Sequence, residues 1–480
     1  MTVAILGGGC TGLATAVELL RRGVPVVVLE AAPAAGGLAA TFERDGFAFD
    51  FGPHELPADD PELRAWLLRL RGVALREHAK RVAQWFRGRL VPYPFGPGDV
   101  LRGIGLRPAL RALAEVALLR ARGAAARPAA SFRAWVEARF GATLEREFFG
   151  PYTRKVWGRD PALLDARTAA ARIPVHSLLA LARHVLRPGA RAAALPRGGH
   201  AELGAGFLHP RGGIGALHRA LEAEVVALGG VIRRGARVTA LEVAEGRAGT
   251  VHCADGTRVA RLRHVVATIP LDALVGVVRP ADAAALLARH PLEWRGIAFV
   301  FLRAARRPVL PWHWVYAGDP GVAFQRVTEF SGFAPEMAPA GRSALACEVS
   351  CEPGDGVWEA ADGDLVARCV AGLERLGVHT RPALLGADVV RQRHAYPVQT
   401  IGYAERAAAL LREVAAVRNL TPLGRQGLFR YCNLDECVAM ARAVAPAIAA
   451  GRLDVAYGGA ARWRGVGLAA GGAASSATPT

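Results

Sequence analysis

Three glycines near the N-terminus have the spacing of a phosphate-binding turn. Gly7, Gly9 and Gly12 follow a short apolar run, Thr2 to Leu6, and precede apolar residues at helical spacing. Gly7 would make the turn, Gly9 would let a pyrophosphate approach the backbone, and Gly12 would let the helix pack on the strand. The helix N-terminus would add N–H donors and the positive end of its dipole. This pattern therefore predicts diphosphate binding.

A second apolar run, Val24 to Leu29, ends in Glu30, eighteen residues beyond Gly12. A carboxylate at this place can hold ribose hydroxyls. A glycine-rich turn alone would be a weak signal, but here it stands between two apolar strands and is followed by an acid. We therefore predict a βαβ unit of a Rossmann-type α/β fold, which suits either FAD or NAD.

Two segments downstream decide between these cofactors. They are AAPAAGGL (residues 31–38) and FAFDFGPH (residues 47–54). They resemble the superfamily of flavin-containing amine oxidases, protoporphyrinogen oxidases and UDP-galactopyranose mutases, in which such segments bring backbone against FAD. The resemblance implies FAD as cofactor, with five residues beside it, the last three near the isoalloxazine: Gly36, Gly37, Gly52, Pro53 and His54. Taken alone, His54 could equally be a histidine of a surface loop.

An aromatic segment, FFGPYTRKVWG (residues 148–158), resembles the uracil-binding segment of UDP-galactopyranose mutases. The resemblance implies that Phe148, Phe149, Tyr152 and Trp157 line a base pocket, and that Arg172 is a loop arginine for the diphosphate. Stacking on aromatic rings suits a pyrimidine. Without the resemblance, an aromatic cluster on a helix would be interpreted as core.

Three later segments extend the same resemblance: AFQRVTEF (323–330), HAYPV (394–398) and GRQGLFRYCNLD (424–435). It implies phosphate binding by Arg326, Tyr396, Arg425 and Tyr431, and contact of Asp435 with the flavin ribityl chain. The planar fork of arginine suits a phosphate, although any one arginine alone could be solvated surface. The candidate catalytic residues are therefore His54, Arg172, Arg326 and Arg425.

The chain also departs from the mutases. Glu55-Leu56-Pro57 follows His54 where they have phenylalanine and histidine, and the stretch from Arg326 to Tyr396 is longer. We therefore favour an FAD-dependent oxidoreductase, in which FAD accepts a hydride from a small-molecule substrate that resembles a nucleotide sugar. The alternative is a mutase-like isomerase that uses reduced FAD without net redox change. A third hypothesis is a non-catalytic flavin-binding protein.

The length of 480 residues suits several interleaved domains. From the apolar runs and the resemblance we predict an α/β protein in which a Rossmann-type FAD domain is interleaved with a mixed-sheet and helical substrate domain. The predicted FAD domain comprises residues 1–54, 206–290 and 396–465. The predicted substrate domain comprises a mainly helical part, 55–205, and a sheet, 291–395, and residues 466–480 form a flexible tail.

Composition limits the partners. The net charge is +18, but Lys80 and Lys155 are the only lysines and the arginines are scattered, so no nucleic-acid partner is predicted. Seven cysteines without CxxC spacing favour a reducing cytoplasm, and no metal site is predicted. No apolar run reaches about eighteen residues, so no membrane-spanning segment is expected. The basic stretch Leu101 to Arg127 could lie on a membrane surface, but we favour a solvated helix face and expect no membrane association. The oligomeric state stays open, a homodimer being one option.

Overall fold

A five-stranded parallel sheet forms around the glycine turn in the computed structural model. The structure describes residues 1–93, 105–121, 123, 128–173, 206–306, 309–379 and 383–453. The strand order is β10-β2-β1-β14-β20, and every neighbouring pair is parallel. The strands are β1 (Thr2–Leu6), β2 (Val26–Leu29), β10 (Val231–Arg233), β14 (Leu262–Ala267) and β20 (Leu420–Pro422). The predicted Rossmann-type α/β fold is confirmed.

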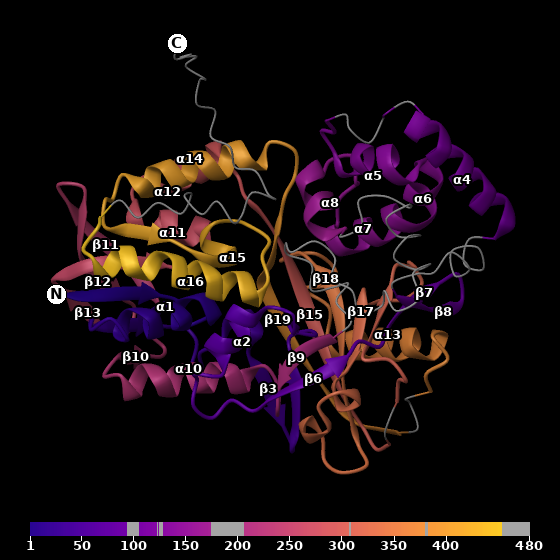
Figure 1. Cartoon of the computed structure of the whole chain (residues 1–480), viewed down its shortest axis with the longest axis horizontal. Helices are drawn as coiled ribbons and strands as arrows, with labels where there is room; N and C mark the ends of the chain where they lie inside the picture. Colours follow the sequence, from indigo (N-terminus) through magenta and orange to yellow (C-terminus); the bar gives the residue numbers. More distant parts are fainter. Residues whose placement is uncertain are drawn as a thin grey trace.

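Helices cover both faces of this sheet (Figure 1). On one face lie α1 (Cys10–Leu20), α10 (Gly215–Ala227) and α16 (Leu434–Ala449), whose apolar side chains share one core. On the other lie α11 (Leu271–Val278) and α14 (Tyr403–Ala415), which pack with an antiparallel meander. The meander comprises β11 (Val238–Ala244), β12 (Arg247–Cys253) and β13 (Arg258–Ala260). Helix α12 (Ala283–Arg289) follows α11 in the chain and packs against the same core. Because both faces are covered, the central strands β1 and β2 are almost wholly apolar and buried.

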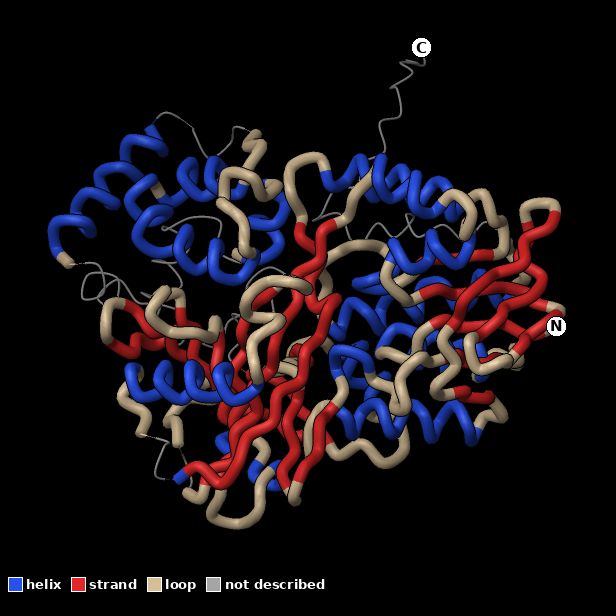
Figure 2. Tube along the Cα trace, turned by 180° about the vertical axis from the view of Figure 1, so that it is seen from behind, coloured by secondary structure: helices blue, strands red, loops and turns tan. Residues whose placement is uncertain are grey.

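A second, seven-stranded sheet has the order β19-β15-β18-β17-β16-β7-β8. Its strands are β7 (Val82–Phe86), β8 (Arg89–Tyr93), β15 (Glu293–Ala304), β16 (Trp314–Ala317), β17 (Arg326–Glu329), β18 (Ser343–Cys351) and β19 (Leu384–Val398). The amphipathic helix α13 (Asp362–Arg375) packs on one face, and a cluster of phenylalanines packs on the other. Seen from behind, the long strands of this sheet run beside the helices that cover the parallel sheet (Figure 2).

A group of helices lies over the end of the second sheet (Figure 1). They are α4 (Leu106–Ala121), α5 (Phe132–Phe140), α6 (Ala142–Leu144), the π-helical turn η3 (Glu145–Phe149), α7 (Gly150–Trp157) and α8 (Ala166–Arg172). Among the described helices, none combines the length and the apolar character that crossing a bilayer requires.

Shorter elements join the two halves. They are β3 (Thr41–Arg44), β4 (Phe47–Asp50), β5 (Leu56–Pro57), α2 (Pro61–Leu67), β6 (Leu75–Ala79), β9 (Gly206–Pro210), α15 (Gly424–Gly427) and the 3-10 turns η1 (Gly37–Ala39), η5 (Phe330–Gly332) and η6 (Pro335–Met337). Strands β3 and β4 pair with each other, and β9 lies between β5 and β6. Helix α2 buries Trp66 in the same core as α1.

The predicted segments can be compared with the described elements at two places. Residues 55–205 are expected to be mainly helical, and their described part contains α2 and α4 to α8 but also β5 to β8, of which β7 and β8 belong to the second sheet. The turn of that hairpin is Arg87-Gly88, both with positive φ, and arginine before glycine is not a usual turn signal. The expected boundary at residue 395 falls inside β19, where Tyr396 still pairs with Arg295.

Buried histidines make the fold sensitive to acid. Burial lowers the pKa of His218 and His264 to about 4 and that of His313 to about 3. An unfolded chain takes up these protons at about pH 6.5, so stability falls as the pH drops below that value towards 4. Replacing His264 by glutamine should remove about 2 kcal/mol of the loss between pH 7 and pH 5. Urea unfolding at the two pH values measures this, and equal pH dependence in variant and wild type would contradict it.

Candidate active site

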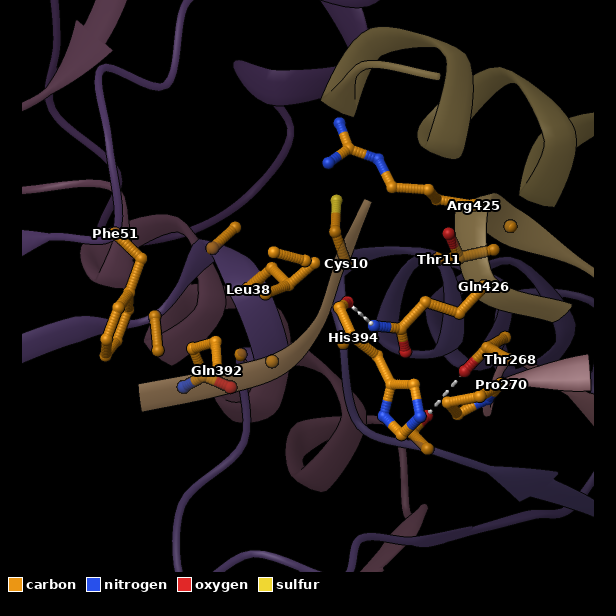
Figure 3. A pocket seen from close by; sticks show the side chains of 18 of the residues that line it. Cys10, Thr11, Leu38, Phe51, Thr268, Pro270, Gln392, His394, Arg425 and Gln426 are labelled. Carbon is orange, nitrogen blue, oxygen red and sulfur yellow. Dashed lines mark hydrogen bonds between the residues drawn. The ribbon is translucent and has the colours of Figure 1, made fainter. Parts of the chain in front are cut away.

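One large cavity lies between the parallel sheet and the second sheet. Its volume is about 1020 Å³, at the upper end of the range of roughly 300–1,000 Å³ for ligand sites. The glycine turn, Glu30 and residues 36–40 line one end, and side chains of β15, β16 and β19 line the other. Figure 3 shows Cys10 and Thr11 of α1 beside the segment that carries Arg425 and Gln426. The cavity thus extends from the glycine turn to the second sheet.

The three turn glycines have different environments. Gly7 has φ +102° and donates its N–H to the carbonyl of Leu29. Among the described residues other than its chain neighbours, none has an atom within 4 Å of where a Cβ of Gly9 would be, so its backbone is open to the cavity. A Cβ on Gly12 would lie 2.0 Å from the carbonyl oxygen of Gly7, which makes glycine necessary there. The backbone is therefore accessible to a ligand where α1 begins.

Glu30 lies at the end of β2 with its carboxylate on the cavity wall. Its Oε2 accepts a hydrogen bond from the N–H of Gly8 and its Oε1 accepts one from the N–H of Ala32, each 2.7 Å long. These bonds fix the side chain, and each carboxylate oxygen keeps a further lone pair for a hydroxyl group. Contact with ribose hydroxyls stays a prediction.

The second glycine pair faces the first turn. Gly36 has φ +123°, donates its N–H to the carbonyl of Gly8 and forms an isolated parallel bridge with Gly9. A Cβ on Gly37 would lie 3.7 Å from the Cα of Gly9. Two stretches of bare backbone thus border the cavity together, which leaves space for a diphosphate.

Asp435 lies in the first turn of α16. Its Oδ1 is buried and has no hydrogen-bond partner among the described residues, and burial raises the pKa of Asp435 to about 7. Its neighbours Asn433, Leu434 and Cys437 line the cavity. Asp435 itself does not line the cavity, so its contact with a flavin ribityl chain stays a prediction. The open glycine backbone and the carboxylate of Glu30 do border the cavity, and these residues fit a bound dinucleotide.

The loop that follows β4 carries Gly52, Pro53 and His54 into the cavity wall. Nε2 of His54 donates to the carbonyl of Leu38 at 3.0 Å, and burial lowers the pKa of His54 to about 4. The imidazole is therefore neutral at pH 7. Sequence reasoning assigned no role to Asp50, yet its buried carboxylate fixes this loop by accepting hydrogen bonds from Thr41 and from the N–H of Ile214.

Five predicted substrate residues gather at one place. The Arg172 guanidinium lies 4.7 Å from the ring centre of Tyr431, 5.8 Å from that of Tyr396 and 5.7 Å from that of Trp157. Arg425 lies over the same two tyrosine rings, at 5.0 and 5.6 Å. We call these five residues the arginine–aromatic cluster. Tyr396, Arg425 and Tyr431 line the cavity, whereas Trp157 and Arg172 stand behind them.

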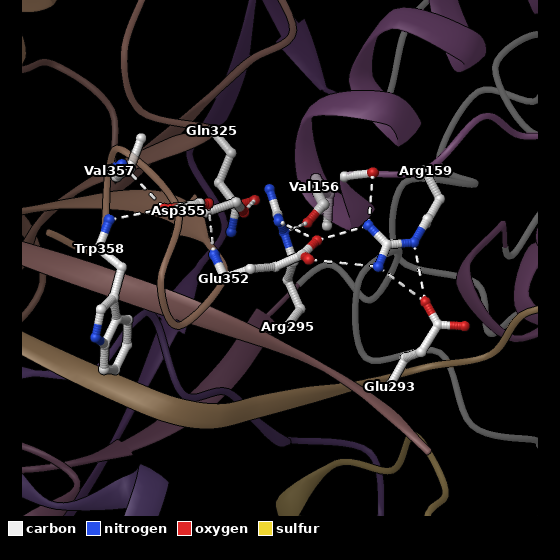
Figure 4. A network of polar contacts seen from close by, with 11 residues as sticks. Val156, Arg159, Glu293, Arg295, Gln325, Glu352, Asp355, Val357 and Trp358 are labelled. Carbon is white, nitrogen blue, oxygen red and sulfur yellow. Dashed lines mark hydrogen bonds and ion pairs between the residues drawn. The ribbon is translucent and has the colours of Figure 1, made fainter. Parts of the chain in front are cut away.

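The positions of Trp157 and its neighbours depend on an ionic network (Figure 4). Arg295 of β15 donates to the carbonyl of Val156 and to Glu352, and Arg159 donates to both Glu352 and Glu293. The network joins the C-terminal end of α7 to two strands of the second sheet. Because Arg295 binds the carbonyl of Val156, the network restrains the adjacent Trp157, whose ring contacts Arg172.

The structure alters the predicted role of Arg326. Its Nε and Nη2 donate to the two carboxylate oxygens of Glu348 at 2.5 and 2.7 Å, directly across β17 and β18. No local sequence pattern indicates this buried partner, because the pairing depends on the register of distant strands. The charge of Arg326 is thus already balanced, so the guanidinium is less suited to a diphosphate than predicted.

The remaining aromatic predictions fall outside the cavity lining. Phe148 packs edge-on against Phe86, and Phe149 packs against Phe140 in the helical layer. Tyr152 packs against Tyr316, which does line the cavity. Phe148 and Phe149 are half-buried, and Phe149 packs against the phenylalanine-rich core of the second sheet. Their predicted role in a base pocket stays a prediction.

Comparisons with known proteins agree with this geometry. The family model of flavin-containing amine oxidoreductases matches residues 10–404. The coproporphyrinogen III oxidase of Propionibacterium freudenreichii subsp. freudenreichii is 26% identical over 92% of this chain and 89% of its own length. The phytoene dehydrogenase of Streptomyces griseus is 32% identical over 50% of this chain, which spans about half (49%) of that relative.

Solved structures show the same fold. A reduced UDP-galactopyranose mutase superposes with a TM-score of 0.77 at 22% identity, over 93% of this chain and 95% of its own. A protein described as a putative protoporphyrinogen oxidase from Exiguobacterium sp. 255-15 has a TM-score of 0.71 at 19% identity, over 94% and 99%. The family match covers most of the chain, and flavin binding agrees with the glycine-lined cavity. The chain belongs to the family of flavin-containing amine oxidoreductases and is an FAD-dependent oxidoreductase.

Proposed function

We propose that this oxidoreductase acts on an anionic substrate whose phosphate or carboxylate group binds at Arg425, a nucleotide sugar being the class that the motifs favour. The observation that supports this most is the setting of the Arg425 side chain. It lines the cavity, its Nε and Nη2 donate to the carbonyl of Cys432, and no carboxylate of the described residues forms an ion pair with it. A fixed, uncompensated guanidinium at a cavity wall suits an anion.

The tyrosines of the arginine–aromatic cluster support the same proposal. Tyr396 and Tyr431 lie beneath Arg425, so that the guanidinium plane is held against their rings. This contact restricts the side chain before a ligand arrives, and less conformational entropy is lost on binding. The hydroxyl of Tyr431 accepts a hydrogen bond from Arg172, which connects both arginines.

Bound FAD would supply hydride acceptance, and the residues of the chain would hold and orient the reactants. The turn glycines and Glu30 would hold the dinucleotide, and Asp435 would accept a hydrogen bond from a hydroxyl of the cofactor. Arg425 would orient the anionic end of the substrate. His54 Nδ1 is the free acceptor of a neutral ring, but its pKa of about 4 makes it a weak base. We therefore assign His54 to closing the cavity wall, not to proton abstraction.

A turnover assay tests the proposal. The yellow protein is incubated with a panel of nucleotide sugars, sugar phosphates and carboxylates, with oxygen or a quinone as acceptor. Substrate-dependent bleaching of the flavin absorbance and consumption of the acceptor are expected for at least one anionic compound. Reduction only by compounds without an anionic group, such as alkylamines, would contradict the proposal.

A second candidate is isomerisation of a nucleotide sugar by the reduced enzyme. The arginine–aromatic cluster favours it, as does the fold shared with a UDP-galactopyranose mutase. Conversion of a UDP-sugar by dithionite-reduced protein, with no electron acceptor present, would establish this reaction. Acceptor consumption without an isomerised product would exclude it.

Replacing Arg425 by alanine is expected to weaken UDP binding about tenfold or more, because a hydrogen bond to a charged group contributes about 1.5 kcal/mol or more. Lysine at this position should restore part of the affinity, since it keeps the charge but loses the fork. Titration of the holoenzyme with UDP, followed by flavin absorbance, gives the dissociation constants. Arg219→Ala, at an exposed ion pair with Glu43, is the matched control. Equal affinity of Arg425→Ala and the control would place the anion elsewhere.

A further inference from the structure

Two buried cysteines lie in contact beside the anion site. The Sγ atoms of Cys432 and Cys437 are 3.8 Å apart, and both residues line the cavity although both are buried. Cys432 directly precedes Asn433, the N-cap of α16, and Cys437 lies in the first turn of that helix. The capping box of Asn433 and Glu436 holds the turn that brings the two sulfurs together. The proposed reaction of the FAD site does not use either thiol.

The pair is chemically asymmetric. Hydrogen bonds from Cys432 and then Thr11 lower the pKa of Cys437, whereas the contact with Cys437 and burial raise the pKa of Cys432. Cys437 also lies at the N-terminus of α16, where the helix dipole favours a thiolate. Cys437 is therefore the nucleophile of the pair, and Cys432 stands in position as the resolving thiol.

We propose that Cys432 and Cys437 are a redox-active dithiol that a peroxide converts into a disulfide, and that this disulfide weakens anion binding at Arg425. In the first step the sulfur of Cys437 attacks peroxide, the O–O bond breaks, and a sulfenic acid and one water form. The sulfur of Cys432 then displaces the hydroxyl group as a second water, and the S–S bond forms. Two thiols and one hydrogen peroxide thus give one disulfide and two waters.

The link to the anion site runs through the backbone of Cys432. Its carbonyl oxygen accepts both hydrogen bonds that fix Arg425. The sulfurs must approach from 3.8 Å to the disulfide length of about 2 Å. We expect part of this approach to come from the segment that carries this carbonyl, because Cys432 and Cys437 are only five residues apart. The second half of the proposal, weaker anion binding at Arg425, rests on the proposed function. The first half, disulfide formation, does not.

Thiol mapping of the holoenzyme tests the first half. The protein is treated with hydrogen peroxide, its free thiols are alkylated after unfolding, and peptides are identified by mass spectrometry. We expect a linked Cys432–Cys437 peptide that dithiothreitol reverses, and a dimedone adduct on Cys437 in Cys432→Ser. Cys347 and Cys369 are the internal control, because they also lie in contact but are fully buried away from the cavity. Free Cys432 and Cys437, or a link from Cys437 to Cys10, would overturn the dithiol.

Titration with UDP tests the second half. Oxidised wild type should bind UDP about tenfold more weakly than reduced wild type, the scale of one lost hydrogen bond to a charged group, and Cys432→Ser should show no change with peroxide. If the disulfide forms and the affinity is unchanged, the regulation of the anion site is refuted. If Arg425→Ala binds UDP normally in the reduced protein, the proposed function fails, and the peptide map still decides the dithiol.

Discussion

Gly12→Ala is expected to remove most of the bound FAD and to destabilise the FAD domain. The added Cβ would lie 2.0 Å from the backbone oxygen of Gly7, and no flexible side chain can move aside. Helix α1 must therefore shift away from β1, which displaces the turn whose N–H groups would face the diphosphate of bound FAD. Overpacking of this kind costs about 3 kcal/mol, and FAD content should fall about tenfold or more, since each 1.4 kcal/mol is a factor of ten.

The measurement compares the ratio of flavin to protein absorbance after identical purification, together with urea unfolding of each protein. Gly276→Ala is the matched control, because Gly276 is also a helical glycine and, outside its own helix, no atom of the described part of the chain lies within 4 Å of its added Cβ. Alanine should be neutral or stabilising there, by up to about 1 kcal/mol. A Gly12→Ala protein that keeps its full FAD content would show that α1 does not pack as described.

Glu348→Ala is expected to reduce the free energy of unfolding by about 3–5 kcal/mol. The side chain of Glu348 is 1% exposed and accepts two hydrogen bonds from Arg326, so its removal leaves an uncompensated charge between two strands. Gln at the same position keeps one acceptor oxygen and should lose less. Because Arg326 also lines the cavity, the flavin spectrum should change in the alanine variant.

Urea denaturation followed by circular dichroism gives the stability of both Glu348 variants. Glu77→Ala removes an exposed partner of Arg64 and serves as the control for a lost ion pair. Exposed pairs contribute up to about 1 kcal/mol, so this variant should unfold almost like wild type. A loss for Glu348→Ala no larger than that of the control would mean that the Arg326–Glu348 pair is not buried in solution.

The sequence predicted those parts of the molecule whose structure depends on residues close together in the chain. The glycines, the apolar run and Glu30 define β1, α1 and β2 within thirty residues, because each element is recognised from its own period and its flanking turn. FAD was separated from NAD only by the resemblance of the segments that end at Gly37 and His54. The arginine–aromatic cluster likewise came from that resemblance, since Arg172 and Arg425 are far apart in the chain.

Other features depend on the pairing of distant strands. Glu348 is the partner of Arg326 because the register of β17 against β18 places the two residues opposite each other. No local sequence pattern indicates this register. The hairpin of β7 and β8 was missed because Arg87-Gly88 is an uncommon turn pair. For Phe148 and Phe149, the resemblance suggested a base pocket while the apolar character of the rings suited packing, and in the structure both rings pack against other phenylalanines.

Identification of the chromophore in the purified wild-type protein tests the central claim most directly. We expect yellow protein with the absorbance of an oxidised flavin, and release of FAD in a ratio near one per chain on heat denaturation, identified by chromatography. Colourless protein that releases no FAD and takes none up on reconstitution would contradict the assignment of the cavity. Release of a nicotinamide dinucleotide instead would contradict it equally.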